Sequence, residues 1–147
     1  MFRDPLYRQI RRRLRELSDG NAFEVCAIGF LQKIYPSLAP REGGDDAGLD
    51  GLIPTEDKSS IQLICTIARD VIGNLTRSIE SNVISGGKSH ACILATSRRL
   101  TNPKKRALEK LADELGRPLI QIYDQAAIAQ LLYRDAAWRK ELLASPH

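Results

Sequence analysis

Between residues 60 and 123 the hydrophobic pattern alternates between strand and helix. Residues 60–68, 91–96 and 119–123 are short apolar runs of strand length, whereas residues 71–83 and 103–115 repeat apolar positions at helical spacing. Strands that alternate with helices in this way form crossover units, whose strands lie parallel in one sheet. This segment therefore predicts an α/β fold.

The flanking segments add helices at both ends and two more strands. We predict helices over residues 5–17, about 22–34 and 126–143, and strands over residues 37–41 and 48–53. Asn21 and Asn102 are the expected N-caps of the second helix and of the helix over 103–115. The order α, α, β, β, β, α, β, α, β, α implies a mixed sheet with helices on both faces. The chain of 147 residues suits one domain: a basic N-terminal helix (1–20), a core (22–133) and a C-terminal helix (126–147).

The composition narrows the class of protein. Hydrophobic residues make up 43% of the chain and charged residues 27%, which is typical of a globular domain and argues against disorder. The apolar runs are too short to span a bilayer, and no signal peptide follows Met1. Cys26, Cys65 and Cys92 show neither metal-binding nor redox spacing, and we expect a reduced, cytoplasmic protein without a membrane partner.

Three polar residues interrupt apolar segments and suggest a chemical site. Glu24 lies in a helix that is apolar nearly all round, so burying its charge costs free energy unless a partner is present. Asp50 alternates with apolar neighbours in one strand, and Gln62 interrupts the apolar run of the next. Oxygen ligands that converge from different elements are what a divalent cation requires.

Each residue also has a plain structural explanation. Glu24 can reach the surface or pair with an arginine of the first helix. Asp50-Gly51 is a strong turn signal, and Gln62 can belong to an exposed edge strand. The pattern alone leaves these alternatives open.

The sequence resembles the Mrr-like branch of the PD-(D/E)XK nucleases over roughly residues 14–133. The likeness lies in Phe23-Glu24, Tyr35-Pro36, Gly43-Gly44-Asp45-Asp46-Ala47-Gly48-Leu49-Asp50-Gly51-Leu52-Ile53, Ile61-Gln62, Ala95-Thr96-Ser97, Leu119-Ile120-Gln121-Ile122-Tyr123-Asp124 and Ala129-Gln130-Leu131-Leu132. This resemblance implies a restriction-endonuclease-like αβββαβ core.

The resemblance also implies roles for individual residues. Glu24, Asp50 and Gln62 would bind Mg²⁺ or Mn²⁺, and a lysine two positions after Gln62 would orient the attacking water. That position is Ile64, which can neither hold water nor stabilise charge. In this superfamily the lysine can move to a neighbouring helix, and Arg69, at the start of the next helix, is therefore the candidate replacement.

Two functions follow as expectations. One is a Mg²⁺-dependent DNA endonuclease, or a nuclease-derived effector domain with an altered active site. The alternative is a catalytically inactive module of the same fold that binds DNA or protein. The resemblance further suggests one module of a longer bacterial protein with a neighbouring ATPase or signalling domain, and a homodimer is another expected assembly.

Basic residues form two clusters in the sequence, which fits a polyanionic partner. The net charge is +4, and only 5% of residues are aromatic, so we expect contacts with the DNA backbone rather than base stacking. Charge runs are often simply solvated helix faces. The candidate DNA-binding residues are Arg11, Arg12, Arg15, Arg98, Arg99, Lys104 and Lys105.

Overall fold

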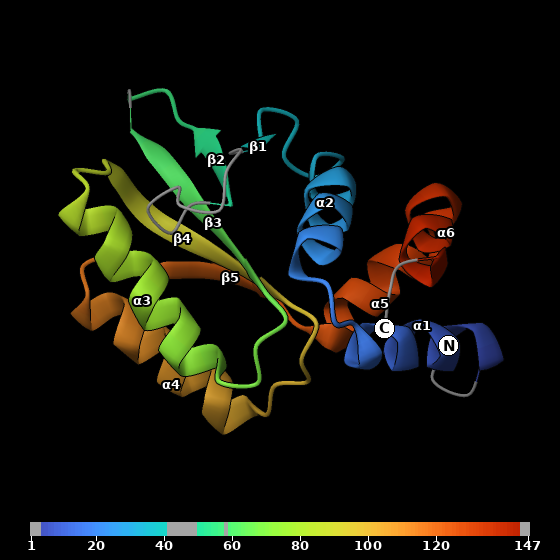
Figure 1. Ribbon diagram of the computed structural model, residues 1–147. Coiled ribbons are helices and arrows are strands. Elements are labelled where there is room, and N and C mark those ends of the chain that lie inside the picture. Colours follow the sequence, from blue (N-terminus) through green and yellow to red (C-terminus); the bar gives the residue numbers. More distant parts are fainter. Residues whose placement is uncertain (1–3, 41–49, 58, 145–147) are drawn as a thin grey trace.

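The computed structural model describes residues 4–40, 50–57 and 59–144. Figure 1 shows a central sheet with helices packed against it. The helices are α1 (Pro5–Glu16), α2 (Gly20–Leu31), α3 (Val71–Ile84), α4 (Asn102–Glu114), α5 (Gln125–Tyr133) and α6 (Ala136–Ala144). The strands are β1 (Ala39–Pro40), β2 (Gly51–Pro54), β3 (Ser60–Thr66), β4 (Ser89–Thr96) and β5 (Leu119–Tyr123).

The sheet is mixed, as the sequence predicts. Its strands lie in the order β1-β2-β3-β4-β5. β1, β2 and β3 pair antiparallel, whereas β3, β4 and β5 pair parallel. Two successive crossovers, through α3 and then α4, produce the parallel half.

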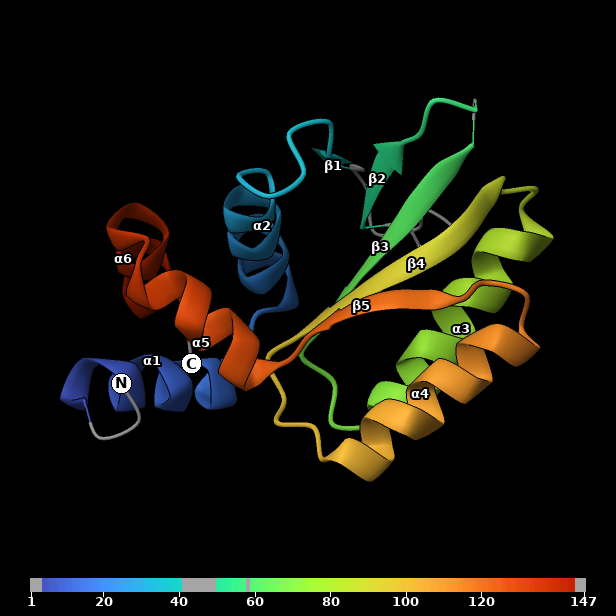
Figure 2. The same ribbon diagram turned by 180° about the vertical axis from the view of Figure 1, so that it is seen from behind.

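The two faces of the sheet are covered by different helices, as the views from the two sides in Figures 1 and 2 show. Because side chains alternate along a strand, β3 contributes to both cores. Leu63 joins a core with α1, α2, α5 and α6, whereas Ile64 joins a core with α3 and α4. We call these sides the α2 face and the α3 face.

At two helices, the capping residue differs from the one that the sequence predicts. α2 begins at Gly20, and the carboxylate of Asp19 accepts hydrogen bonds from the backbone amides of Asn21 and Ala22. α4 begins at Asn102, and the hydroxyl of Thr101 accepts from the amide of Lys104. In each case a better-placed oxygen lies one or two residues earlier than the asparagine that the sequence predicts as the cap.

The expected helix over 126–143 is two helices. α5 ends at Tyr133, and α6 begins at Ala136 after a break at Arg134 and Asp135. Asp135 accepts from the backbone amide of Trp138 at 3.2 Å and pairs with the ammonium of Lys33 at 2.7 Å. This capping carboxylate interrupts the helix and starts a new one.

Some expectations lie partly beyond the described residues. The end of the strand predicted at 37–41 and the start of the strand predicted at 48–53 fall in the range 41–49. No helix in the described part of the chain is long and apolar enough to cross a membrane.

Candidate functional site

Glu24 and Asp50 approach the same residue of β3. α2 packs on this strand and carries Glu24, while Asp50 lies just before β2. The backbone amide of Cys65 donates to Oδ2 of Asp50 at 2.6 Å. Burial raises the pKa of the Cys65 thiol well above its usual value, and the nearby charges of Asp50 and Glu24 raise it further. Asp50 thus contacts β3 at Cys65, and the charge of Glu24 acts on the same residue.

Gln62 lies on the α3 face of the sheet. Its side chain is fully buried, and Oε1 accepts a hydrogen bond of 2.7 Å from Nη1 of Arg117. Its Nε2 donates to the carbonyl of Ser78 in α3 at 3.3 Å. The oxygen expected to bind a metal therefore faces a buried arginine on the α3 face.

Ile64, at the position of the missing lysine, and Arg69, its candidate replacement, lie in different surroundings. Ile64 is fully buried in the apolar core of the α3 face. Arg69 is exposed in the connection between β3 and α3, just before Asp70, which caps that helix. No hydrogen bond joins Arg69 to Glu24 or Asp50 in the described structure.

These positions test whether a divalent cation fits. Mg²⁺ requires oxygen ligands that converge. Within the described ranges, the oxygen of Gln62 accepts from Arg117, and no three histidine, cysteine or acidic side chains form a group able to hold a metal ion.

The parallel strands β3 and β4 each end at a threonine whose hydroxyl binds the backbone of the following loop. The hydroxyl of Thr66 accepts from the amide of Ala68 at 3.0 Å, and that of Thr96 accepts from the amide of Arg98 at 3.1 Å. The two threonines are paired in register. Nε of Arg98 then donates to the carbonyl of Ile67 at 2.8 Å and ties the two loops together.

A basic groove lies where α1 meets this end of the sheet. It has a volume of about 840 Å³, and we call it the arginine groove. The residues that line it are Pro5, Tyr7, Arg8, Gln9, Arg11, Arg12, Arg15, Arg99 and Gln125. Five of them are arginines, and none of these lining residues is acidic.

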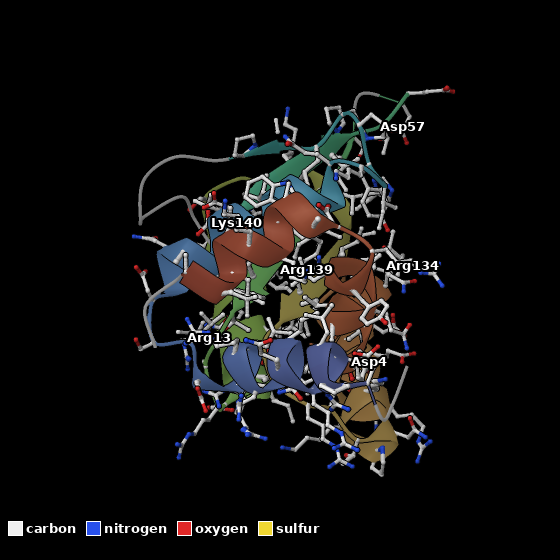
Figure 3. The ribbon with its side chains drawn as sticks, turned by 90° about the vertical axis from the view of Figure 1, so that its right-hand side faces the viewer. Asp4, Arg13, Asp57, Arg134, Arg139 and Lys140 are labelled. Atoms are coloured by element: carbon white, nitrogen blue, oxygen red, sulfur yellow. The ribbon has the colours of Figure 1, made fainter. Side chains whose placement is uncertain are left out.

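Helical geometry explains the charge of the groove. Tyr7, Ile10 and Leu14 are buried on the inner side of α1, as predicted. Arg8, Arg11, Arg12 and Arg15 recur at intervals of three, one and three residues, so they share the remaining surface of the helix. Arg13 points elsewhere: it lies toward α6 in Figure 3 and donates to the carbonyl of Leu143.

The fold brings some residues of both basic clusters into one groove. Arg11, Arg12 and Arg15 of the first cluster and Arg99 of the second line the same groove. Arg98, Lys104 and Lys105 do not line it. Lys105 instead lies 3.5 Å from the carboxylate of Asp124, which caps α5.

Three residues that shape the groove are missing from the candidates that the sequence suggests. Arg8 is three residues before Arg11, so its helical spacing is a usable signal. Gln125 lies 114 positions beyond Arg11, yet its Oε1 accepts from Nε of Arg11 at 2.9 Å. Nothing local in the sequence indicates that contact, or the buried ring of Tyr7 beneath the same arginine.

Comparison with known proteins adds no assignment: no family model matches this sequence, and no curated protein matches it.

Proposed function

We propose that this chain is a nuclease-fold domain that binds the phosphate backbone of DNA in the arginine groove. The observation that carries the proposal is the set of five arginines around one groove without an acidic lining residue. Guanidinium groups match phosphate oxygens in charge and in geometry. The only aromatic lining residue, Tyr7, is 1% exposed, which leaves no platform for base stacking.

The groove defines an expected salt dependence. If all five arginines neutralise phosphates, log K falls with log salt concentration with a slope of about −4.5. Raising the salt from about 50 mM to about 200 mM then weakens binding about 500-fold. Binding to the backbone alone also predicts little dependence on DNA sequence.

The order of elements supports a restriction-endonuclease-like fold. A helix, α2, precedes the antiparallel meander β1-β2-β3, and α3 then leads to β4, which is parallel to β3. This is the αβββαβ order that the resemblance implies. The likeness of Glu24 and Asp50 to the family motif belongs to the same proposal.

Metal-dependent cleavage of DNA is the second candidate. It is favoured by one observation, the approach of Glu24 and Asp50 to the same point of β3. The position of Gln62 and the buried Ile64 favour binding without cleavage.

One experiment separates the two candidates. Binding of a fluorescent duplex is measured by anisotropy at several salt concentrations, and nicking of supercoiled plasmid is followed with Mg²⁺ and with Mn²⁺. We expect binding with a steep salt dependence and no nicking. Cleavage that disappears in Asp50→Ala would instead establish the nuclease.

A matched pair of variants tests the groove. Arg12→Glu with Arg15→Glu reverses two charges in the groove, and Lys104→Glu with Lys110→Glu reverses two exposed charges of α4 outside it. The net charge change is the same. We expect the groove variant to lose about 100-fold or more in affinity and the α4 variant to lose much less. Equal losses would contradict binding in the groove.

A further inference from the structure

Arg11 is held differently from the other four arginines of the groove. Its Nε donates to Oε1 of Gln125 at 2.9 Å, and its guanidinium carbon lies 5.9 Å from the centre of the Tyr7 ring. Arg8, Arg12, Arg15 and Arg99 are exposed, and none of their side chains makes a hydrogen bond or ion pair within the described residues. One arginine of the five is therefore fixed before any ligand arrives.

Gln125 is itself fixed by the end of β4. Its Nε2 donates to the carbonyl of Ser97 at 3.2 Å, and its backbone amide donates to the carbonyl of Arg98 at 3.0 Å. The residue is only 5% exposed. With its amide nitrogen committed to Ser97, its oxygen is directed at Arg11.

This arrangement leaves the two terminal nitrogens of the Arg11 guanidinium available to a ligand. Only Nε of Arg11 is used, so the two terminal nitrogens have no hydrogen-bond partner among the described residues. Two such nitrogens form the fork that binds two oxygens of one phosphate. Because the side chain is already ordered, binding there avoids much of the usual loss of rotamer freedom.

We infer that Arg11 is the fixed phosphate-binding position of the groove and that Gln125 is the residue that positions it. The ligand class is a phosphodiester group of the DNA backbone, bound by the fork of Arg11, while the four exposed arginines neutralise neighbouring phosphates. The inference rests on the proposed function and refines it.

The test uses the whole chain and a fluorescent 20-base-pair duplex. The variants are Arg11→Ala, Gln125→Leu and the double variant, with Arg12→Ala as the control that removes an equal charge from an unanchored position. Affinity is measured by anisotropy from about 50 mM to about 200 mM salt.

Gln125→Leu removes no charge, which makes it the informative variant. We expect it to weaken binding by about threefold to tenfold, the effect of releasing one long side chain, while the salt slope stays unchanged. Arg11→Ala should weaken binding more than Arg12→Ala does, although both lower the magnitude of the slope by about 0.9. Arg11→Lys should bind more weakly than the native chain but keep the native salt slope, because an ammonium retains the charge and offers no fork.

The double variant decides whether the two residues act together. If Gln125 acts through Arg11, the double variant binds no more weakly than Arg11→Ala alone. Additive losses, or native affinity in Gln125→Leu, would overturn the inference while DNA binding itself stands. Failure of the native chain to bind the duplex would overturn the proposed function as well.

A second measurement covers the case in which Gln125→Leu does not fold, as judged by circular dichroism. The side-chain Nε–H signal of Arg11 in the native protein is identified by its absence in Arg11→Lys. We expect that signal to exchange slowly with water and to shift when the duplex is added. Rapid exchange like that of the other groove arginines would contradict a fixed Arg11.

Discussion

Arg117 is 4% exposed and carries its charge among neutral acceptors. Its Nη1 donates to Gln62 and to Asn82, each at 2.7 Å, and its Nη2 donates to the carbonyl of Gly87 at 3.0 Å. None of the described acidic groups forms an ion pair with it. Burial lowers the pKa of Arg117, but hydrogen bonds to three oxygens compensate part of the lost hydration. The arrangement joins β3, α3 and the start of β5.

Arg117→Met tests the structural role of this network. Removing the guanidinium leaves the oxygens of Gln62 and Asn82 buried beside an apolar group, so we expect a loss of about 3 kcal/mol in the free energy of unfolding. Urea denaturation measures it. The control Arg134→Met, at an exposed arginine, should change stability by less than about 0.5 kcal/mol. Equal midpoints for the two variants would contradict the role assigned to Arg117.

Ser97 and Thr96 are adjacent buried hydroxyls with opposite expected effects. The hydroxyl of Ser97 has no hydrogen-bond partner within the described structure, whereas that of Thr96 accepts from the amide of Arg98. Ser97→Ala should therefore raise the free energy of unfolding by about 1 kcal/mol, and Thr96→Val should lower it by a similar amount. Thermal denaturation of both variants checks the contrast, and destabilisation by Ser97→Ala would contradict it.

Between helices, a close approach joins α2 to α6. A methyl group at Gly29 would lie 2.0 Å from Cζ2 of Trp138, so the indole occupies the space of the absent side chain. This contact explains a glycine inside an otherwise apolar helix. It also packs the partly buried Trp138 against the core of the α2 face.

Gly29→Ala should separate these helices. Alanine favours a helix by about 1 kcal/mol over glycine, but the clash with Trp138 should outweigh this and destabilise the protein by about 1–3 kcal/mol. Gly20→Ala is the control, because it lies in the same helix and its methyl group would meet no atom within 4 Å. Denaturation together with tryptophan fluorescence reports stability and the environment of Trp138. If both variants behave alike, the contact with Trp138 is unimportant.

For helices and strands, the sequence predicts the features that depend on local interactions and misses those that depend on contacts between distant residues. The strands at 60–68, 91–96 and 119–123 and the helices between them follow from local periodicity, and all appear within a few residues of their expected bounds. The break in the last helix comes at Asp135, which caps α6 and pairs with Lys33. No local pattern in the sequence reveals that distant pairing. Gln62 shows the same limit: periodicity places Gln62 and Ile64 on one face of β3, but only the packing of α2 and α3 decides which face it is.

At the scale of the whole molecule, the two ends of the chain form one layer. α1 packs against both α5 and α6, and Figure 3 shows Asp4 at the start of α1 on the side of α5. The hydroxyl of Tyr133 donates to Asp4, and Lys33 pairs with Asp135. The arginine groove lies between α1 and the start of α5, so its shape depends on the docking of the two ends.

Acid should weaken that docking. The hydrogen bond from Tyr133, together with that from the amide of Leu6, lowers the pKa of Asp4. Burial by itself would raise the pKa of Asp135, but the bonds from Lys33 and from the amide of Trp138 outweigh it and leave this pKa below its usual value. A carboxyl group whose folded pKa is depressed adds stability above its unfolded pKa of about 4, and that stability is lost as the pH falls through the lower, folded value.

We therefore expect the melting temperature to fall steeply below about pH 4, and the decrease to be smaller in Asp4→Asn. Asparagine cannot titrate, yet it can keep both contacts: its amide oxygen accepts from the backbone amide of Leu6, and its NH2 donates to the hydroxyl of Tyr133. The variant therefore separates the charge of residue 4 from its contacts. Asp113→Asn, at an exposed carboxylate of α4, is the control and should follow the native curve. Melting from about pH 7 to about pH 2 distinguishes them. If Asp4→Asn follows the native acid limb as well, the ionisation of Asp4 does not hold α1 against α5.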